Sequence, residues 1–221
     1  MLSYLILLLF AVACSVAGER PSNAAAAAFY QSGRIDEALA VLRQLMDAQN
    51  EVPDPQTHFL LGAALNAKGD DTQAIRQYHT AMQLDPTLQY SSWYNIGVIH
   101  RHQKQYELAL QAFTKAIAVR PECPLTLNNI GLMHHFQSQH EQAVPFFSRG
   151  LKFSLLQQST TTKHNIVAAE IYFNMGVTLS RLQRIHQAET AYRGATEAAK
   201  FGSDLWVSAT LNLAALCTFC D

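Results

Sequence analysis

The residues best suited to chemistry in this chain are four asparagines that recur at one register. Each stands two residues before a small residue, and the four pairs are Asn95 and Gly97, Asn129 and Gly131, Asn174 and Gly176, and Asn212 and Ala214. Asparagine is less favourable than alanine in a helix by roughly half a kcal/mol, so four copies need a cause. The amide carries a donor and an acceptor, which match the backbone of an extended peptide without recognising its sequence. The series predicts either a peptide-binding surface or bonds between neighbouring helices that stabilise the stack.

Motifs that would indicate catalysis are absent from the sequence. It contains no G-x-x-x-x-G-K-[ST], G-x-G-x-x-G, H-E-x-x-H or G-x-S-x-G segment. The nine histidines include the adjacent pair His134 and His135. Side chains that are adjacent on a helix point in different directions, which disfavours a metal site built from this pair. We therefore expect no enzymatic activity, no metal and no cofactor in this chain.

Charge and composition narrow the class of partner. The 221 residues are 49% hydrophobic with a formal net charge of −1, and no basic tract is long enough to neutralise a phosphate backbone. We therefore expect a protein or peptide ligand and no nucleic acid. The hydrophobic content is sufficient for a continuous core.

The elements that position the asparagines follow from a repeated spacing. Its clearest copy consists of Trp93, Ile96, Gly97, Ala109, Phe113, Ala116 and Pro121. The glycines at positions 62, 97, 131 and 176 mark four copies, at separations of 35, 34 and 45 residues, so an insertion lies before the last one. Glycine removes bulk where one helix crosses another, and the aromatic residue that lies four after alanine fills the space beside the crossing.

This spacing resembles the tetratricopeptide (TPR) repeat, W-x2-L-G-x2-Y followed by A-x3-F and P in about 34 residues. The resemblance implies an all-α fold, a right-handed α-solenoid of stacked antiparallel helix pairs with about five repeats and a partial sixth. We expect this solenoid to cover residues 19–221. Its units lie near residues 19–54, 55–89, 90–123, 124–157, 169–202 and 203–221, the last one partial, with an insertion at 158–168.

The resemblance also implies a binding surface, because the first helices of TPR pairs line a concave groove. The asparagine series resembles the TPR region of the glycosyltransferase that adds single N-acetylglucosamine units to proteins. The cationic clamp that other TPR proteins use for a C-terminal carboxylate lacks its Lys or Arg residues here. The groove is instead expected to hold apolar pockets with basic edges. Its expected residues, besides the asparagines, are Val98, Leu132, Phe136 and Val177 in the pockets, with Arg101, Arg181 and His135 at the edges.

The first 17 residues are apolar and uncharged, and small residues precede Gly18. This pattern predicts a signal peptide, although no Lys or Arg precedes the apolar run. The segment could alternatively be a short uncleaved anchor, an atypical first helix or an error in the gene start. A genuine targeting segment implies a secretory, periplasmic or membrane-anchored protein, and otherwise the chain is cytoplasmic. Membrane contact is expected only through this segment.

The other end of the sequence is apolar as well. Residues 205–220 align Asn212 with the start of a sixth unit whose second helix is missing. Because terminal repeats of solenoids need a polar outer face, we expect that the natural chain continues past Asp221, or that this helix docks on a partner or on a second copy.

Two functions are therefore considered. The first is a non-enzymatic TPR scaffold that binds a peptide or a partner helix in its groove. The second is the substrate-recruiting arm of a larger enzyme, such as a protein glycosyltransferase. If the asparagines bind peptide, changing Asn129 and Asn174 to alanine should weaken binding with little effect on thermal unfolding.

Overall fold

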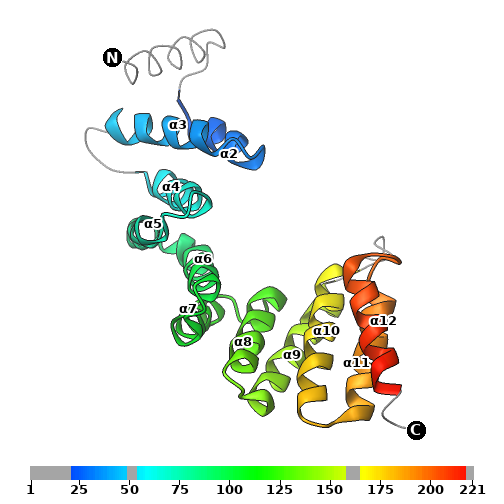
Figure 1. Ribbon diagram of the computed structural model, residues 1–221. Helices are drawn as coiled ribbons and strands as arrows, with labels where there is room; N and C mark the ends of the chain where they lie inside the picture. Colours follow the sequence, from blue (N-terminus) through cyan, green and yellow to red (C-terminus); the bar gives the residue numbers. More distant parts are fainter. Residues whose placement is uncertain (1–20, 49–53, 158–164, 218–221) are drawn as a thin grey trace. The chain divides into compact units, whose positions relative to one another are not determined.

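The computed structural model describes residues 21–48, 54–157 and 165–217, which form the expected all-α fold with no strand among them. The chain divides into two compact units, residues 1–88 and 89–221, and each described part is a stack of antiparallel helix pairs (Figure 1). The first unit contains α2 (Asn23–Gln31), α3 (Ile35–Ala48), α4 (Pro55–Ala67), α5 (Asp71–Leu84) and the 3-10 helix η1 (Pro86–Leu88). The second contains α6 (Gln89–His102), α7 (Tyr106–Val119), α8 (Pro124–Phe136), α9 (His140–Leu156), α10 (Ile166–Arg181), α11 (Ile185–Ala198) and α12 (Asp204–Cys217).

Two of the predicted segments fall outside this description. The predicted leader, residues 1–17, and most of the predicted insertion, residues 158–164, lie outside the described residues. Among the helices that are described, none combines the length and the apolar character needed to cross a membrane.

The turn inside each helix pair needs a left-handed backbone at one position. The second residue after the first helix has a positive φ in five pairs, with values of 76° at Gly33, 83° at Gly69, 58° at Lys104, 61° at Ser138 and 59° at Gln183. Glycine adopts this conformation without steric cost, whereas a residue with a Cβ loses about 1 kcal/mol. Because five turns share one geometry, the second helix leaves the first in the same way in each pair.

Proline sets several of the helix boundaries. α4 and α8 each begin at a proline, whose missing N–H has no partner to lose at the first helical position. α5 ends at Leu84 and α7 ends at Val119, each two residues before a proline, Pro86 or Pro121, and a proline disfavours helical geometry at the residue before it.

In α6–α7, α8–α9 and α10–α11, the closest packing places an aromatic ring against a glycine. A Cβ added at Gly97, Gly131 or Gly176 would lie 2.7, 2.6 or 2.8 Å from the ring of Phe113, Phe147 or Tyr192, respectively. Each ring comes from the second helix of the same pair and is at most 3% exposed. The recurring glycine is therefore required because the ring occupies the space that a side chain would need.

Asn165 fixes the start of α10, which begins at Ile166, inside the range 158–168 that the sequence analysis assigned to the insertion. Its side-chain oxygen accepts a hydrogen bond from the Ala168 backbone N–H at 2.9 Å and so caps the helix. Its amide also donates to the Ser154 carbonyl oxygen on α9 at 3.1 Å. The capping residue therefore starts the helix before the repeat pattern itself begins.

We expect Gly131→Ala to lower the free energy of unfolding by about 1–2 kcal/mol, because the new methyl group would clash with the ring of Phe147. This net loss remains after the roughly 1 kcal/mol that alanine gains over glycine in a helix. Urea unfolding followed by circular dichroism measures it. Phe147→Leu leaves more room at the crossing, so Gly131→Ala should cost less in that background. An equal cost in both backgrounds would contradict the ring-to-glycine contact.

Candidate functional site

Hydrogen bonds join the first helices of neighbouring pairs in the second unit. Asn129 on α8 is only 4% exposed. Its Oδ1 accepts a bond from Arg101 Nη1 on α6 at 2.5 Å. Its Nδ2 donates to the Tyr94 hydroxyl on α6 at 3.3 Å and to the Leu125 carbonyl oxygen at 3.0 Å. Both N–H groups of this amide are therefore engaged within the protein, and the bonds to Arg101 and Tyr94 hold α6 to α8.

A second set of bonds joins α8 to α10. Asn174 Nδ2 donates to Asn128 Oδ1 at 3.0 Å. One turn further along, the Thr178 hydroxyl donates to the Asn174 carbonyl oxygen at 2.8 Å and lies 2.9 Å from His135 Nδ1. A hydroxyl has only one proton to donate, and the Thr178 hydroxyl donates it to the Asn174 carbonyl oxygen. In the second bond the Thr178 oxygen is therefore the acceptor, and His135 Nδ1 is the donor. The imidazole therefore has its lone pair on Nε2.

The beginning of α6 is tied to α8 by a tyrosine. The Tyr90 hydroxyl lies 2.8 Å from Cys123 Sγ and 3.1 Å from Thr126 Oγ1. Burial, together with the bond to Cys123, raises the pKa of Tyr90 to about 12, so this hydroxyl stays protonated and can donate. The guanidinium of Arg120 lies 4.2 Å from the centre of the Tyr90 ring.

The four predicted asparagines thus have different environments. Asn129 and Asn174 bond across neighbouring helix pairs, the arrangement that the sequence offered as the alternative to peptide binding. Asn95 on α6 and Asn212 on α12 are half-buried, and neither amide bonds to another described residue. Asn128 and Tyr94 complete the network. The repeat pattern did not identify them, because their bonding partners lie 35 or more positions away in the chain.

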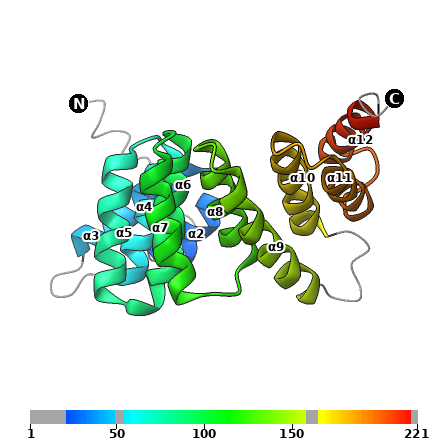
Figure 2. The same cartoon turned by 90° about the horizontal axis from the view of Figure 1, so that it is seen from below.

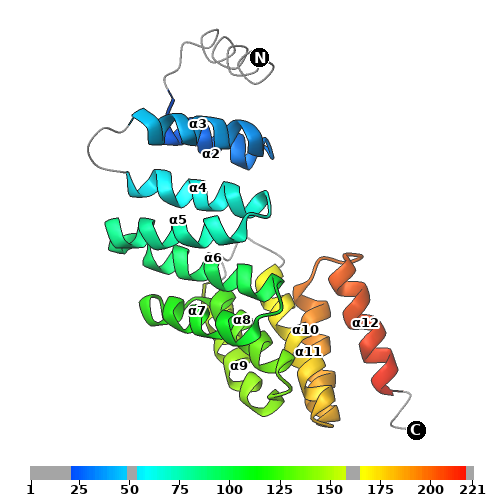
Figure 3. The same cartoon turned by 60° about the vertical axis from the view of Figure 1, so that its left-hand side comes forward.

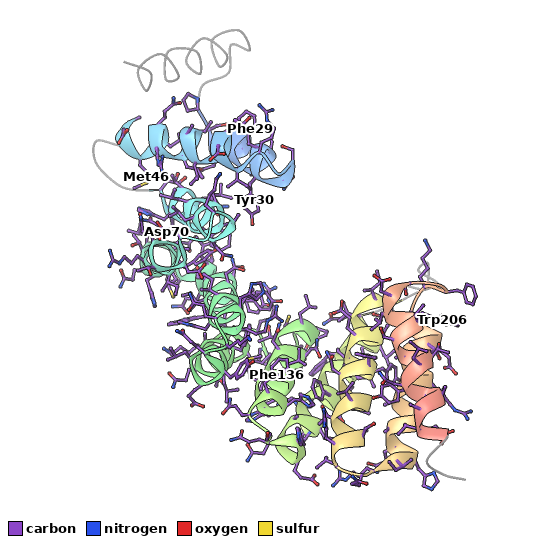
Figure 4. The ribbon with its side chains drawn as sticks, viewed as in Figure 1. Phe29, Tyr30, Met46, Asp70, Phe136 and Trp206 are labelled. Carbon is purple, nitrogen blue, oxygen red and sulfur yellow. The ribbon has the colours of Figure 1, made fainter. Side chains whose placement is uncertain are left out.

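The apolar residues of the expected pockets also differ from one another. Val98, Leu132 and Val177 are half-buried and pack against the rings and small residues of the core. Phe136, in contrast, is 48% exposed on α8 and stacks on Tyr106 with ring centroids 5.1 Å apart (Figure 4). Only Phe136, among these four, offers a large apolar surface to a ligand.

Three charged side chains complete this region. Among the described residues, neither Arg101, Glu170 nor Arg181 takes part in an ion pair. Desolvation raises the pKa of Glu170, and the charge of Arg101 opposes this effect. Glu170 was not predicted from the sequence, because its spacing to Asn174 becomes meaningful only once α10 is known to begin at Ile166.

Two histidines, His100 and His134, each bond to a glutamine at the turn that follows their helix. His100 Nδ1 lies 2.7 Å from Gln105 Oε1, and His134 Nδ1 lies 2.7 Å from Gln139 Oε1, at equivalent places in two successive pairs. Both rings are half-buried, and each has one nitrogen bonded to a glutamine side chain. The part of the chain that the structure describes contains no group of three potential metal ligands.

Comparison with known proteins decides the family. Family models described as tetratricopeptide repeat match residues 23–89, 90–123 and 169–201, which together make up more than half of the chain. The chain belongs to the tetratricopeptide repeat family. Gly97 with Phe113 and Gly176 with Tyr192 lie inside the matched repeats.

Curated relatives match a smaller part of this TPR chain. It is 27% identical over 90 residues to the photosystem I assembly protein Ycf3 of Rippkaea orientalis, a match that covers 40% of the chain and 52% of the relative. Ycf3 of Cuscuta gronovii is 26% identical over 90 residues, with 40% and 54% covered. The match therefore spans about half the length of these relatives.

Solved structures support the same fold over more of the chain. MamA of Desulfovibrio magneticus RS-1 has a TM-score of 0.65 at 19% identity, covering 78% of this chain and 90% of that one. A chain of the APC/C hetero-tetramer Cut9-Hcn1 has a TM-score of 0.66 at 18% identity, covering 87% and 36%. At these identities the likeness concerns the TPR solenoid fold alone.

We expect Asn129→Ala to lower the free energy of unfolding by about 2–3 kcal/mol, because three hydrogen bonds are lost and the buried partner groups are left behind. This differs from the small effect expected of an amide that only binds peptide. Asn95→Ala, at the same register without such bonds, should change the value by less than about 0.5 kcal/mol. Urea unfolding measures the free energy of unfolding of both variants. Equally small losses in the two variants would contradict the bonding role of Asn129.

The second prediction concerns pH. Burial, together with the neighbouring His140 and Arg181, holds the pKa of His135 below its ordinary value of 6.5. The unfolded chain then binds more protons at this site, so stability should fall as the pH drops through about 6.5 and level off below the folded pKa. His135→Gln should flatten this part of the curve in urea unfolding between about pH 5 and 8. An unchanged slope would contradict the prediction.

Proposed function

We propose that this TPR chain is a non-catalytic scaffold that binds a protein or peptide ligand on the face of α6, α8 and α10. The observation that supports it most directly is the combination of an exposed ring, Phe136, with the unpaired charges of Arg101, Glu170 and Arg181. Phe136 is 48% exposed although it stacks on Tyr106, and the exposed carboxylate of Glu170 forms no ion pair with a described residue. A ligand that covers them would account for both.

The repeat register supports a common face for these residues. Phe136 and Arg181 each lie five positions after the glycine of their helix, and Arg101 and His135 each lie four positions after theirs. Residues at equivalent positions of stacked helices point to the same side of the stack. The proposed face therefore carries Arg101 on α6, His135 and Phe136 on α8, and Arg181 on α10.

The amides that join α8 to α10 keep part of their bonding capacity. Asn174 donates one N–H to Asn128, which leaves the oxygen of the half-buried Asn174 and the amino group of Asn128, a residue only 6% exposed, without a further bond to a described residue. One peptide unit of a ligand offers the matching pair, an N–H for the oxygen and a C=O for the amino group. Asn128 thereby takes the place that the sequence analysis gave to Asn129, whose N–H groups are already engaged.

These groups define the chemistry of the proposed ligand. An apolar side chain would pack on Phe136, and an acidic side chain nearby would pair with Arg181. A basic side chain would suit Glu170. A short amphipathic segment with main-chain contacts to the paired amides meets these requirements better than a uniformly acidic tail.

The alternative function, a substrate-recruiting arm of a larger enzyme such as a protein glycosyltransferase, would use the same face. The full-length transcript distinguishes the two, since a catalytic domain encoded after residue 221 would favour the enzyme. The role of residues 1–17 as a targeting segment is a separate proposal, and N-terminal sequencing of the purified protein tests it.

The binding face is tested with peptides selected from a display library on the full chain. Phe136→Ala should weaken the selected peptides about tenfold or more, because it removes the exposed apolar anchor. Leu108→Ala is the matched control, since this leucine on α7 is 45% exposed against 48% for Phe136. It should change affinity by less than about twofold. Fluorescence anisotropy measures both, and equal losses would contradict the proposed face.

A further inference from the structure

His135 on α8 has one ring nitrogen bonded inside the protein and the other left open. Its Nδ1 donates to the Thr178 hydroxyl of α10 at 2.9 Å, and that hydroxyl donates in turn to the Asn174 carbonyl oxygen. Nε2 has no hydrogen-bond partner among the described residues, and it is not among their fully buried atoms that lack a partner. The bond to Thr178 therefore fixes the tautomer and leaves a lone pair at an accessible nitrogen.

The titratable groups that act on His135 from the neighbouring helices are basic. Arg181 on α10 and His140 at the start of α9 are both close enough for their charges to act on the imidazole. α9 packs against α8 (Figure 2) and against α10 (Figure 3), and the ring centroids of His140 and His135 lie 4.8 Å apart. Glu141, the next residue on α9, is paired with Arg184 at 2.8 Å. No described carboxylate therefore forms an ion pair with His135 or Arg181.

Of the two neighbouring imidazoles, His135 is the one suited to take up a proton for a ligand. Nδ1 of His140 is buried without a partner, so a hydrogen on this nitrogen would have no acceptor among the described residues. Nε2 of His135 is not enclosed in this way, and a hydrogen on it would be presented to a ligand.

Arg181 has no anion beside it within its own helix. The carboxylate of α10, Glu170, stands eleven positions earlier, which is roughly 16 Å along the helix. A ligand carboxylate that pairs with Arg181 would come within range of His135, because these two side chains already act on each other. The lone pair of a neutral Nε2 would repel this carboxylate, whereas a protonated Nε2 would donate a charge-assisted hydrogen bond to it.

We infer that an acidic side chain of the ligand binds to Arg181 and His135 together, and that His135 takes up a proton from solvent at Nε2 as the ligand binds. The inference rests on the proposed function, because it concerns the same face. Burial and the charges of His140 and Arg181 hold the pKa of His135 down in the free chain, and a ligand carboxylate opposes both charges. Protonation and binding therefore favour each other, so the affinity should rise as the pH falls.

Isothermal titration calorimetry tests this coupling on the full chain. The probe is a display-selected peptide that contains an acidic residue and that loses affinity in Phe136→Ala, which shows that it occupies the proposed face. Its Kd should fall about fivefold or more between about pH 7.5 and pH 5.5. Titrations near pH 6 in two buffers of different ionisation enthalpy should show uptake of roughly half a proton per peptide.

Changes in the peptide identify the group that requires the proton. Replacing the acidic side chain by its amide should abolish both the pH dependence and the proton uptake, whereas amidation of the peptide C-terminus should leave both in place. An acidic peptide whose affinity is constant or falls as the pH drops would overturn the inference and leave the proposed face intact. Phe136-dependent peptides that all lack an acidic residue would overturn it as well. A library without any Phe136-dependent peptide would contradict the proposed function, and this inference with it.

Changes in the chain identify the group that takes up the proton. His135→Asn keeps an amide donor near the place of Nδ1 and cannot take up a proton, so both effects should disappear. His134→Asn is the matched control, because this preceding residue of α8 bonds to Gln139 at 2.7 Å, and its uptake should equal that of the unaltered chain. Circular dichroism at each pH checks that the variants are folded. Uptake that persists in His135→Asn, or that is lost equally in both variants, would contradict the assignment to His135.

The free chain provides a test of the tautomer without any peptide. Long-range ¹H–¹⁵N correlation spectra near pH 7.5 should show His135 with its hydrogen on Nδ1 and none on Nε2. A hydrogen on Nε2 in this spectrum would overturn the inference, because a neutral His135 could then donate to a carboxylate without taking up a proton.

Discussion

The contact on which the rest of the second unit depends is the aromatic ring packed against a glycine inside each helix pair. The rings of Phe113, Phe147 and Tyr192 are almost fully buried, and they leave no space for a Cβ on the facing helix. This fixes how closely two helices approach and which residues of the first helix remain uncovered. Since the contact recurs in successive pairs, the first helices present equivalent residues to one another.

The hydrogen bonds between the first helices of neighbouring pairs depend on this packing. Asn129 reaches Arg101 and Tyr94, and Asn174 reaches Asn128, only because equivalent positions of neighbouring pairs lie within hydrogen-bond distance. A buried amide without partners would cost about 1–3 kcal/mol, so these bonds favour one spacing of the pairs over others. The same bonds occupy groups that a ligand would otherwise use. The proposed ligand face therefore relies on Arg181 and on the exposed Phe136.

The sequence predicts those features that repeat at a fixed spacing. The helix pairs, the glycine crossings and the stops before Pro86 and Pro121 each follow from residues close together in the chain. The partners of Asn129 do not, because the choice between a ligand and a neighbouring helix depends on side chains 28 and 35 positions away. The repeat pattern also does not predict that Phe136 is more exposed than Leu132, since both are apolar residues of one helix.

One position of the crossing differs among the first helices. The residue seven positions before the left-handed turn is glycine in α4, α6, α8 and α10, but it is Ala26 in α2. Ala26 is buried, and α2 still packs against α3. The second helix also differs there, because α3 has the buried Leu42 four residues after its alanine, where the other pairs have an aromatic ring. The residues of both helices at the crossing, and not the glycine alone, therefore set how closely the two helices approach.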